Sequence, residues 1–476
     1  MLLALCAVIV SACVGDTADS TTTAVTDMTT STTTASTTTM GDTTSSAGRL
    51  MPVPAGPAVS CFYLDGFIAL TEGQADAAID ALAPYDVQVE SVPPSAVLDD
   101  TTAEGVGETT SEEVSEILDG QLDLLSTTVD SFDVATLLTE TLEIRSGPIY
   151  AIGQASHWKL KAGTDPISRP EATLPDPTAD VGEGIIAVVD SGIVEDPRGP
   201  DWMSRGEHVL YDDKDIETTT DDPRLASHGT FVTSIIRQLA PAYRVAFASA
   251  QPVAPDSIVA REEDPLPPDF PYVSTELHVA EAMTRLTTRS ELAAENVAAL
   301  NLSLGTYTCA PGEDPTMVAT MAAMRIWFGA FPESTVFAAG GNEPYVEPFW
   351  PAGLSTYPLD PNIQPDWVRG VGAVNESGDQ VVWGSTASAA TTIPMPAPAR
   401  PWVTNVAPGC DLLGLRGGTA SDGAGVVAWS GSSFATAVSA ALVTTGMSPV
   451  ATGPPHEYDY GVPGLSFENL GSCDIP

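Results

Sequence analysis

The sequence is poor in positive charge. Eighteen Lys and Arg residues stand against 63 Asp and Glu residues, so the formal net charge is −45 and the pI is near 4.1. Lysine occurs only at Lys159, Lys161 and Lys214. A surface this acidic repels nucleic acids and anionic lipid head groups, so we expect neither as a direct partner. Because salt screens repulsion between like charges, the composition also favours tolerance of salt.

Cysteine is scarce as well, and no two cysteines show the C-x-x-C spacing that is typical of zinc sites. Cys6 and Cys13 lie in the N-terminal apolar segment. The other four cysteines could form two disulfides in an oxidising compartment, and three pairings stay open. These four are Cys61, Cys309, Cys410 and Cys473.

The apolar run at residues 1–12 is too short to cross a bilayer as a stable helix, and it is typical of a signal peptide. It leads into Val10-Ser-Ala-Cys13, which resembles a bacterial lipobox, whose cysteine becomes the lipidated first residue of the mature protein. An ordinary signal peptide with an incidental cysteine is the alternative. We predict a signal peptide with a lipobox over residues 1–13, lipidation of Cys13 and an extracellular or cell-surface location. A membrane is then a partner only through this anchor.

The rest of the chain falls into three stretches. Residues 14–49 consist mainly of Thr and Ser and cannot form a core, so we predict a disordered tether. Residues 50–178 show mixed helix and strand patterns, which predict a small α+β domain that ends in a Pro-, Asp- and Thr-rich linker from residue 162. The expected elements are strands at 66–70, 86–92 and 147–152 and helices at 72–83 and 111–125.

Residues 179–476 alternate between strand and helix patterns. This alternation predicts a parallel sheet with helices on both faces. The Pro- and Asp-rich residues 250–272 interrupt the pattern, and we expect them to form a surface insertion.

Four side chains in this stretch lie at predicted strand ends or helix starts. Asp190 ends a buried strand, and in a parallel sheet that end faces the ligand crevice. His228 begins a helical apolar pattern, and Asn342 follows another buried strand. Ser433 begins an Ala-rich helix, where unpaired N–H groups and the helix dipole favour a developing negative charge. Taken alone, each of these residues is more often a cap, turn or core residue than a catalytic one.

Together these motifs resemble those of the subtilisin-like serine proteases, the subtilase family (peptidase S8). They read Val-Val-Asp-Ser-Gly around Asp190, His-Gly-Thr-Phe-Val at His228, Ala-Gly-Gly-Asn at Asn342 and Gly-Ser-Ser-Phe-Ala at Ser433. The chain order Asp, His, Ser is also the order of that family. The resemblance covers roughly residues 180–450.

The resemblance implies a subtilisin-like three-layer α/β domain with a mainly parallel central sheet, preceded by a small α+β propeptide-like domain. It also implies a serine endopeptidase that hydrolyses polypeptides through an acyl-enzyme intermediate. Ser433 is the expected nucleophile, His228 the base, Asp190 the residue that orients the imidazole, and Asn342 a donor to the oxyanion. No cofactor is expected in the chemistry. Family members often bind structural Ca²⁺, and carboxylates are plentiful here, but no calcium-loop pattern stands out.

Substrate contacts are implied by the same resemblance. Ser303, Leu304 and Gly305 resemble the family segment whose backbone pairs with an extended peptide, and we expect Gly340 to lie beside the substrate too. A simple strand-end turn is the alternative at 303–305. The chain departs from the family pattern at positions that bear on packing rather than on proton transfer. They are Phe231, Ser432 and Phe434.

The α+β domain ahead of these motifs resembles an inhibitory propeptide. We therefore expect residues 50–178 to act as an intramolecular inhibitor that Ser433 cuts between about residues 155 and 182, in and around the predicted linker. A permanent accessory domain is the alternative.

Two other functions compete with proteolysis. A catalytically silent subtilase-fold surface binding protein is disfavoured because all four catalytic positions are intact. An esterase is disfavoured because the sequence lacks a strand–Gly-x-Ser-x-Gly–helix elbow followed by Asp and His.

Overall fold

The computed structural model describes residues 62–101, 111–154, 167–174, 182, 184–194, 200–216, 227–250, 258–260, 274–308, 317–343, 347–357, 359–375, 380–383, 390–393, 400–417 and 425–444. The chain divides into two units, Met1–Ala47 and Gly48–Pro476, and every described residue lies in the second. The predicted signal peptide, Cys13 and tether lie outside the described residues. Within the described segments, no helix combines the length and the apolar character that crossing a membrane requires.

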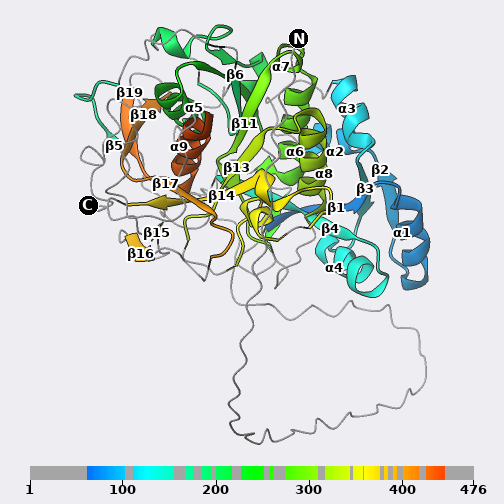
Figure 1. Ribbon diagram of the computed structural model, residues 1–476. Helices are drawn as coiled ribbons and strands as arrows, with labels where there is room; N and C mark the ends of the chain where they lie inside the picture. The colour runs from blue at the N-terminus through cyan, green and yellow to red at the C-terminus, as the bar shows by residue number, and fades with distance from the viewer. Residues whose placement is uncertain are drawn as a thin grey trace, which may run out of the picture. The chain divides into compact units, whose positions relative to one another are not determined.

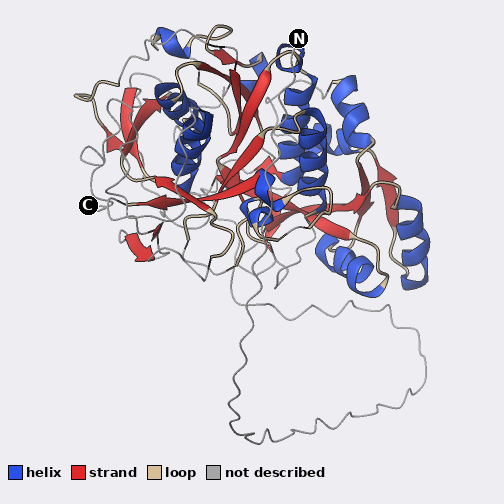
Figure 2. Ribbon diagram, in the orientation of Figure 1, coloured by secondary structure: helices blue, strands red, loops and turns tan. Residues whose placement is uncertain are grey.

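A nine-stranded sheet forms the centre of the larger region (Figures 1 and 2). Its strands lie in the order β16-β15-β14-β13-β11-β6-β8-β7, and β17 pairs with β14. The pairs from β7 to β14, and β14 with β17, are parallel, whereas β15 and β16 are antiparallel. The predicted mainly parallel sheet is therefore confirmed. Its strands are β6 (Gly184–Asp190), β7 (Val209–Leu210), β8 (Tyr243–Ser249), β11 (Asn296–Leu302), β13 (Thr335–Ala339), β14 (Val368–Val374), β15 (Gln380–Trp383), β16 (Ala390–Ile393) and β17 (Asn405–Pro408).

Helices cover both faces of this sheet, as Figure 1 shows. Along β6, Ile186 and Val188 pack in one core with α5 and α9, whereas Ile185, Ala187 and Val189 pack in another with α6 and α8. Because both faces of the strand are buried, its sequence is a continuous apolar run. The helices are α5 (His228–Leu239), α6 (Glu276–Thr288), α7 (Ser290–Ala293), α8 (Val318–Ala330) and α9 (Ser432–Thr444).

Residues 62–154 form a small α+β region, as predicted. Four strands make an antiparallel sheet in the order β4-β1-β3-β2. Ile68, Leu82 and Leu125 contribute to an apolar core of its own. The elements are β1 (Phe62–Thr71), α1 (Ala75–Leu82), β2 (Val89–Val92), α2 (Pro94–Thr101), α3 (Glu112–Asp119), β3 (Leu122–Thr127), α4 (Ser131–Thr136) and β4 (Ser146–Gln154), with a π-helical turn at Leu137–Thr141.

The predicted helix at 111–125 is wrong in its second half. The helix α3 ends at Asp119, and the following leucines belong to β3. Leu122 and Leu124 pack in one core and Leu125 in the other. This alternation with a period of two residues is that of a strand buried on both faces.

Three segments of the larger region extend the N-terminal sheet. β9 (Ile258–Ala260) pairs with β1, while β10 (Ser274–Thr275) and β12 (Leu304–Gly305) pair with β4. The predicted surface insertion at 250–272 therefore contains a strand at 258–260. One apolar core also contains residues of both regions, among them Leu64 and Met283.

A separate three-stranded antiparallel sheet leads into α9. It consists of β18 (Leu412–Arg416), β19 (Gly425–Trp429) and β5 (Ile167–Ser168). Ser234 of α5 accepts the N–H of Leu415 at 2.9 Å, which fixes α5 against β18. The sheet therefore links the helix that begins at His228 to the one that carries Ser433.

Candidate active site

The end of β6 and the start of α5 bring a carboxylate and an imidazole together. His228 Nδ1 lies 2.7 Å from Asp190 Oδ1, and both side chains are fully buried. An ionised carboxylate only accepts hydrogen bonds, so Nδ1 carries the proton. The Ser191 N–H also donates to Asp190 Oδ1, at 2.8 Å, which holds the carboxylate in place. In the described part of the chain, His228 Nε2 has no hydrogen-bond partner, so it can accept a proton.

Ser433 lies in the first turn of α9 and is buried. Its hydroxyl donates to the Ser303 carbonyl at 2.9 Å, and Ser303 Oγ donates to the Ser433 carbonyl at 2.6 Å. The expected hydrogen bond from Ser433 to His228 is therefore not formed here. The His228 ring nevertheless lies 5.3 Å from the ring of Phe434, the residue that follows Ser433. The three expected triad residues share one neighbourhood, with Ser433 turned to a backbone oxygen.

Aromatic rings surround the imidazole. Trp429 approaches the His228 ring edge-on with a centroid distance of 5.6 Å. The ring centroids of Phe231 and Phe434 lie 4.7 Å apart. Phe231 and Phe434 are two of the departures from the family pattern, and their role here is packing. A close-packed apolar wall limits the number of orientations that the imidazole can adopt.

Asn342 lies beside the start of α9. Its side-chain Oδ1 accepts the N–H of Ser432 at 2.7 Å, and the residue is fully buried. The bond fixes the amide plane, so the Nδ2 side of the amide presents donors next to Gly431. Gly341, just before it, has φ +86°, and a Cβ there would meet the Tyr307 hydroxyl at 2.8 Å. This turn therefore requires glycine.

The expected substrate segment carries a strand. Leu304 pairs with Gln154 and Gly305 with Gly153, in antiparallel register. The C-terminal end of β4 therefore lies on β12 in the way that an extended peptide adds to a sheet edge. β4 also pairs with β10, through Ala151 and Ile152. Gly340, the remaining expected substrate contact, leads into the Asn342 turn, where its N–H donates to the Val371 carbonyl at 2.7 Å.

Sequence reasoning missed a buried charged cluster beside Asn342. Burial raises the pKa of Glu343 to about 7, although the Tyr307 hydroxyl donates to it at 3.0 Å. Arg400 is also buried, and its guanidinium donates to the Gly341 carbonyl at 3.1 Å and to the Gly340 carbonyl. Arg400 lies some 60 residues from the glycines that it holds, and no local pattern in the sequence marks it.

The described segments contain no group of three or more His, Cys, Asp or Glu side chains that could hold a metal ion. Structural Ca²⁺ therefore stays a prediction of the family resemblance. Cys410 is disulfide-bonded. The other five cysteines lie outside the described residues, so the pairing stays open.

Comparisons with known proteins agree with the motifs. The family model for the subtilase family matches residues 182–458, which is more than half of the chain. A search of curated proteins found no match.

Several solved structures resemble the chain at low identity. Fervidolysin from Fervidobacterium pennivorans, a keratinolytic enzyme related to subtilisin, is 15% identical with a TM-score of 0.44, and the match covers 87% of this chain but only 60% of fervidolysin. The MycP3 protease of the type VII (ESX-3) secretion system is 19% identical with a TM-score of 0.33, covering 61% of this chain and 81% of that one. A cold-adapted subtilisin-like serine proteinase is 18% identical with a TM-score of 0.34, covering 62% and 86%.

Proposed function

This chain belongs to the subtilase family of serine proteases, and from that premise we propose that it is an endopeptidase that works through an acyl-enzyme on Ser433. The observation that carries the proposal is the buried Asp190–His228 pair. Asp190 fixes Nδ1, and Nε2 is left without a partner in the described segments, in the neighbourhood of Ser433. A serine hydroxyl is a weak nucleophile at neutral pH and needs such a base.

The proposed reaction proceeds in two acyl-transfer steps. Ser433 leaves the Ser303 carbonyl and gives its proton to His228 Nε2 as its oxygen attacks the substrate carbonyl carbon. The resulting oxyanion accepts hydrogen bonds from the Asn342 amide and the Ser433 N–H. His228 then gives the proton to the leaving amine, and water releases the acyl group by the same route. These residues supply the nucleophile, the base and the oxyanion donors, so the proposed reaction uses no cofactor.

We also propose that residues 50–178 inhibit the site until they are cut. The support is the position of β4, which occupies the edge of β12 that a substrate would use. The last paired residue of β4, Gln154, lies opposite Leu304, which directly follows Ser303, and the Ser303 carbonyl accepts the Ser433 hydroxyl. We therefore propose a cut beyond Gln154, between about residues 155 and 182.

The experiment compares wild type with Ser433→Ala and with Ser432→Ala. Wild type and Ser432→Ala should give two fragments with a new N-terminus between about residues 155 and 182, found by mass spectrometry, whereas Ser433→Ala should stay one chain. The fragments should co-elute, because both regions share a sheet and an apolar core. If Ser433→Ala is cut at the same bond, Ser433 is not the nucleophile. If wild type digests casein while it stays intact, residues 50–178 are an accessory domain.

The silent binding protein is the second candidate, and one observation favours it. Ser433 is buried and bonded to Ser303, so the described state is closed to substrate. A fluorophosphonate probe separates the two functions. Processed wild type should be labelled and Ser433→Ala should not, whereas a silent protein stays unlabelled in both forms.

We further propose that the protein is exported and held at the cell surface through Cys13. The support is the resemblance of residues 10–13 to a lipobox and the Thr- and Ser-rich stretch that follows. An unmodified mature N-terminus away from Cys13 would contradict this proposal.

A further inference from the structure

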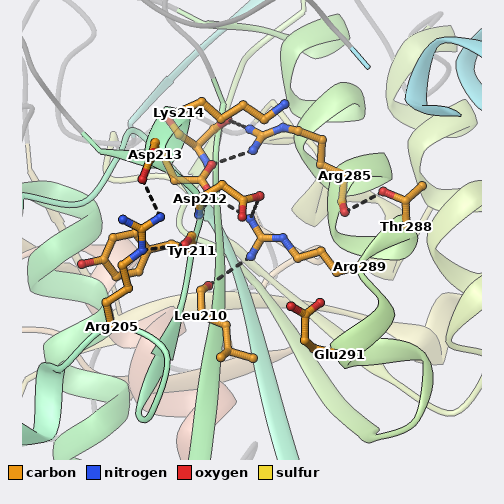
Figure 3. A network of polar contacts seen from close by, with 12 residues as sticks. Arg205, Leu210, Tyr211, Asp212, Asp213, Lys214, Arg285, Thr288, Arg289 and Glu291 are labelled. Atoms are coloured by element: carbon orange, nitrogen blue, oxygen red, sulfur yellow. Dashed lines mark hydrogen bonds and ion pairs between the residues drawn. The ribbon is translucent and has the colours of Figure 1, made fainter. Parts of the chain in front are cut away.

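A polar network of buried and half-buried charges lies near the end of β8. It joins the short loop after β7 to α6 and to Arg289, the residue that follows α6, and Figure 3 shows Asp212, Arg285 and Arg289 turned toward one another. Arg285 Nη1 donates to Asp215 Oδ1 at 2.6 Å, and Arg289 Nη2 donates to Asp215 Oδ2 at 2.7 Å. Arg289 also binds Asp212 at 2.8 Å, and Arg285 Nε lies 2.7 Å from Glu281. Asp215 and Arg285 are buried, so their charges are held by each other rather than by water.

The network reaches the catalytic strand through Ser249, the last residue of β8. The Ser249 N–H donates to Asp215 Oδ1 at 2.8 Å, and the Ser249 carbonyl accepts from Arg285 Nη2. The Ser249 hydroxyl donates to the Ser191 carbonyl at 2.8 Å. Ser249 is also the register partner of Asp190 between the parallel strands β6 and β8. The N–H and the carbonyl of Ser249 therefore bind the Asp215–Arg285 ion pair, and its hydroxyl binds Ser191, the residue after Asp190.

The turn that follows Asp190 is held at two points. Ser249 binds the Ser191 carbonyl, and the Asp215 carbonyl accepts the Ile193 N–H at 2.9 Å. Ser191 in turn donates its N–H to Asp190 Oδ1, the oxygen that binds His228. A shift of this turn would therefore move the oxygen that orients the imidazole.

We infer that Ser249 and Asp215 are positioning residues for the Asp190–His228 pair, with Arg285 holding Asp215 in place. The inference rests on the proposed function, because it assigns these residues a role in the same proton transfer. Neither residue touches substrate. Their effect passes through the Ser191–Ile193 turn, so it acts on the orientation of the base and not on substrate affinity.

The test uses Ser249→Ala, which removes one hydroxyl and leaves the ion pair intact. We expect kcat to fall by about ten- to a hundredfold with KM nearly unchanged, since misplacing a reacting group by 1 Å can cost about a hundredfold. We also expect the acidic limb of the kcat/KM profile to move to lower pH, because a loosened carboxylate stabilises the imidazolium less. Ser355→Ala is the matched control, because Ser355 is also buried and its hydroxyl donates to a backbone carbonyl, that of Trp402, at 2.7 Å.

A second pair of variants tests the acidic side of the network. Asp215→Asn should reproduce the kinetic change, whereas Asp212→Asn, which contacts Arg289 but not Ser249, should lower only the melting temperature. The inference is overturned if Ser249→Ala matches Ser355→Ala in kcat and pH profile. An inactive wild type would instead reject the proposed function.

Discussion

At the scale of single residues, Asn342, the proposed oxyanion donor, has a side-chain amide whose orientation one hydrogen bond holds. Its Oδ1 is engaged by the Ser432 N–H, so the amide cannot flip without losing that bond. A donor that is already oriented when charge develops costs no reorganisation during the reaction. The orientation of Asn342 therefore depends on the first turn of the helix that carries Ser433.

Replacing Asn342 should lower the rate of the chemical step and not substrate binding. We expect Asn342→Leu to reduce kcat by about 10²- to 10³-fold with little change in KM, as the loss of one such donor typically does. Asn342→Asp is the informative companion, because it keeps the acceptor for the Ser432 N–H and replaces the donor by a negative charge. Steady-state kinetics on a peptide substrate measure both. Near-normal turnover by Asn342→Asp would show that the amide does not serve the oxyanion.

The sequence motifs predicted the residues of the candidate active site but not the residues that hold them in position. Asp190, His228, Asn342 and Ser433 could be found because each lies next to glycines or at a strand end within a short, local pattern. Ser249 carries no such pattern. Its role depends on contacts with residues 34 to 58 positions away along the chain, and only the folded structure brings them together.

At the scale of elements, local patterns predicted the type of element well and its ends less well. The helix predicted at 111–125 was too long at its C-terminal end, because Leu122, Leu124 and Leu125 are compatible with a helical face as well as with a strand. Pairing of β3 with β1 and β2 decided the outcome, and such pairing is not local. The strand β9 was missed for the same reason, since three residues gain a strand conformation only by pairing with β1.

The N-terminal end of α6 also connects the two regions. Glu276, the first residue of α6, is buried, accepts the Tyr150 N–H of β4 at 2.9 Å and accepts from the Thr320 hydroxyl at 2.6 Å. Burial raises the pKa of Glu276 to about 7, against the lowering effect of these hydrogen bonds. The unfolded carboxyl has its ordinary value of 4.5. The raised pKa means that protonation of Glu276 favours the folded state, so its contribution is complete below pH 4.5 and is lost as the pH rises through 7.

The pH dependence can be isolated with Glu276→Ala in the uncut Ser433→Ala background. The variant should be less stable throughout, because it loses the three hydrogen bonds that the carboxylate accepts from Tyr150 and Thr320 and leaves a cavity. The gap in unfolding free energy between the Ser433→Ala protein and the same protein carrying Glu276→Ala should narrow between about pH 4.5 and 7. It should stay constant above pH 7, as linkage requires. Urea unfolding at several pH values measures the gap. A gap that stays constant over this range would show that Glu276 is already ionised in the folded state by pH 4.5.

At the scale of the whole molecule, composition predicts surface charge and its effect on partners, which the arrangement of helices and strands does not. The net charge of −45 predicts little affinity for anionic lipids. The described helices offer no membrane span. Division into an N-terminal α+β region and a larger α/β region was also readable from the alternation of patterns. The sequence did not predict that the two regions share a sheet, because β9, β10 and β12 are too short to show a strand pattern.

The charge also makes the proposed anchor testable. A protein that anionic head groups repel cannot stay on a membrane by electrostatics, so binding should depend on the lipid at Cys13 alone. We expect wild type to fractionate with membranes and to stay there in about 1 M salt, where the Debye length is only about 3 Å and ionic attachment is screened. Detergent should release it. Cys13→Ala should appear in the soluble fraction while keeping the activity of wild type, and Cys6→Ala is the matched control that should stay bound. Release of wild type by salt, or membrane retention of Cys13→Ala, would show that something other than this lipid holds the protein.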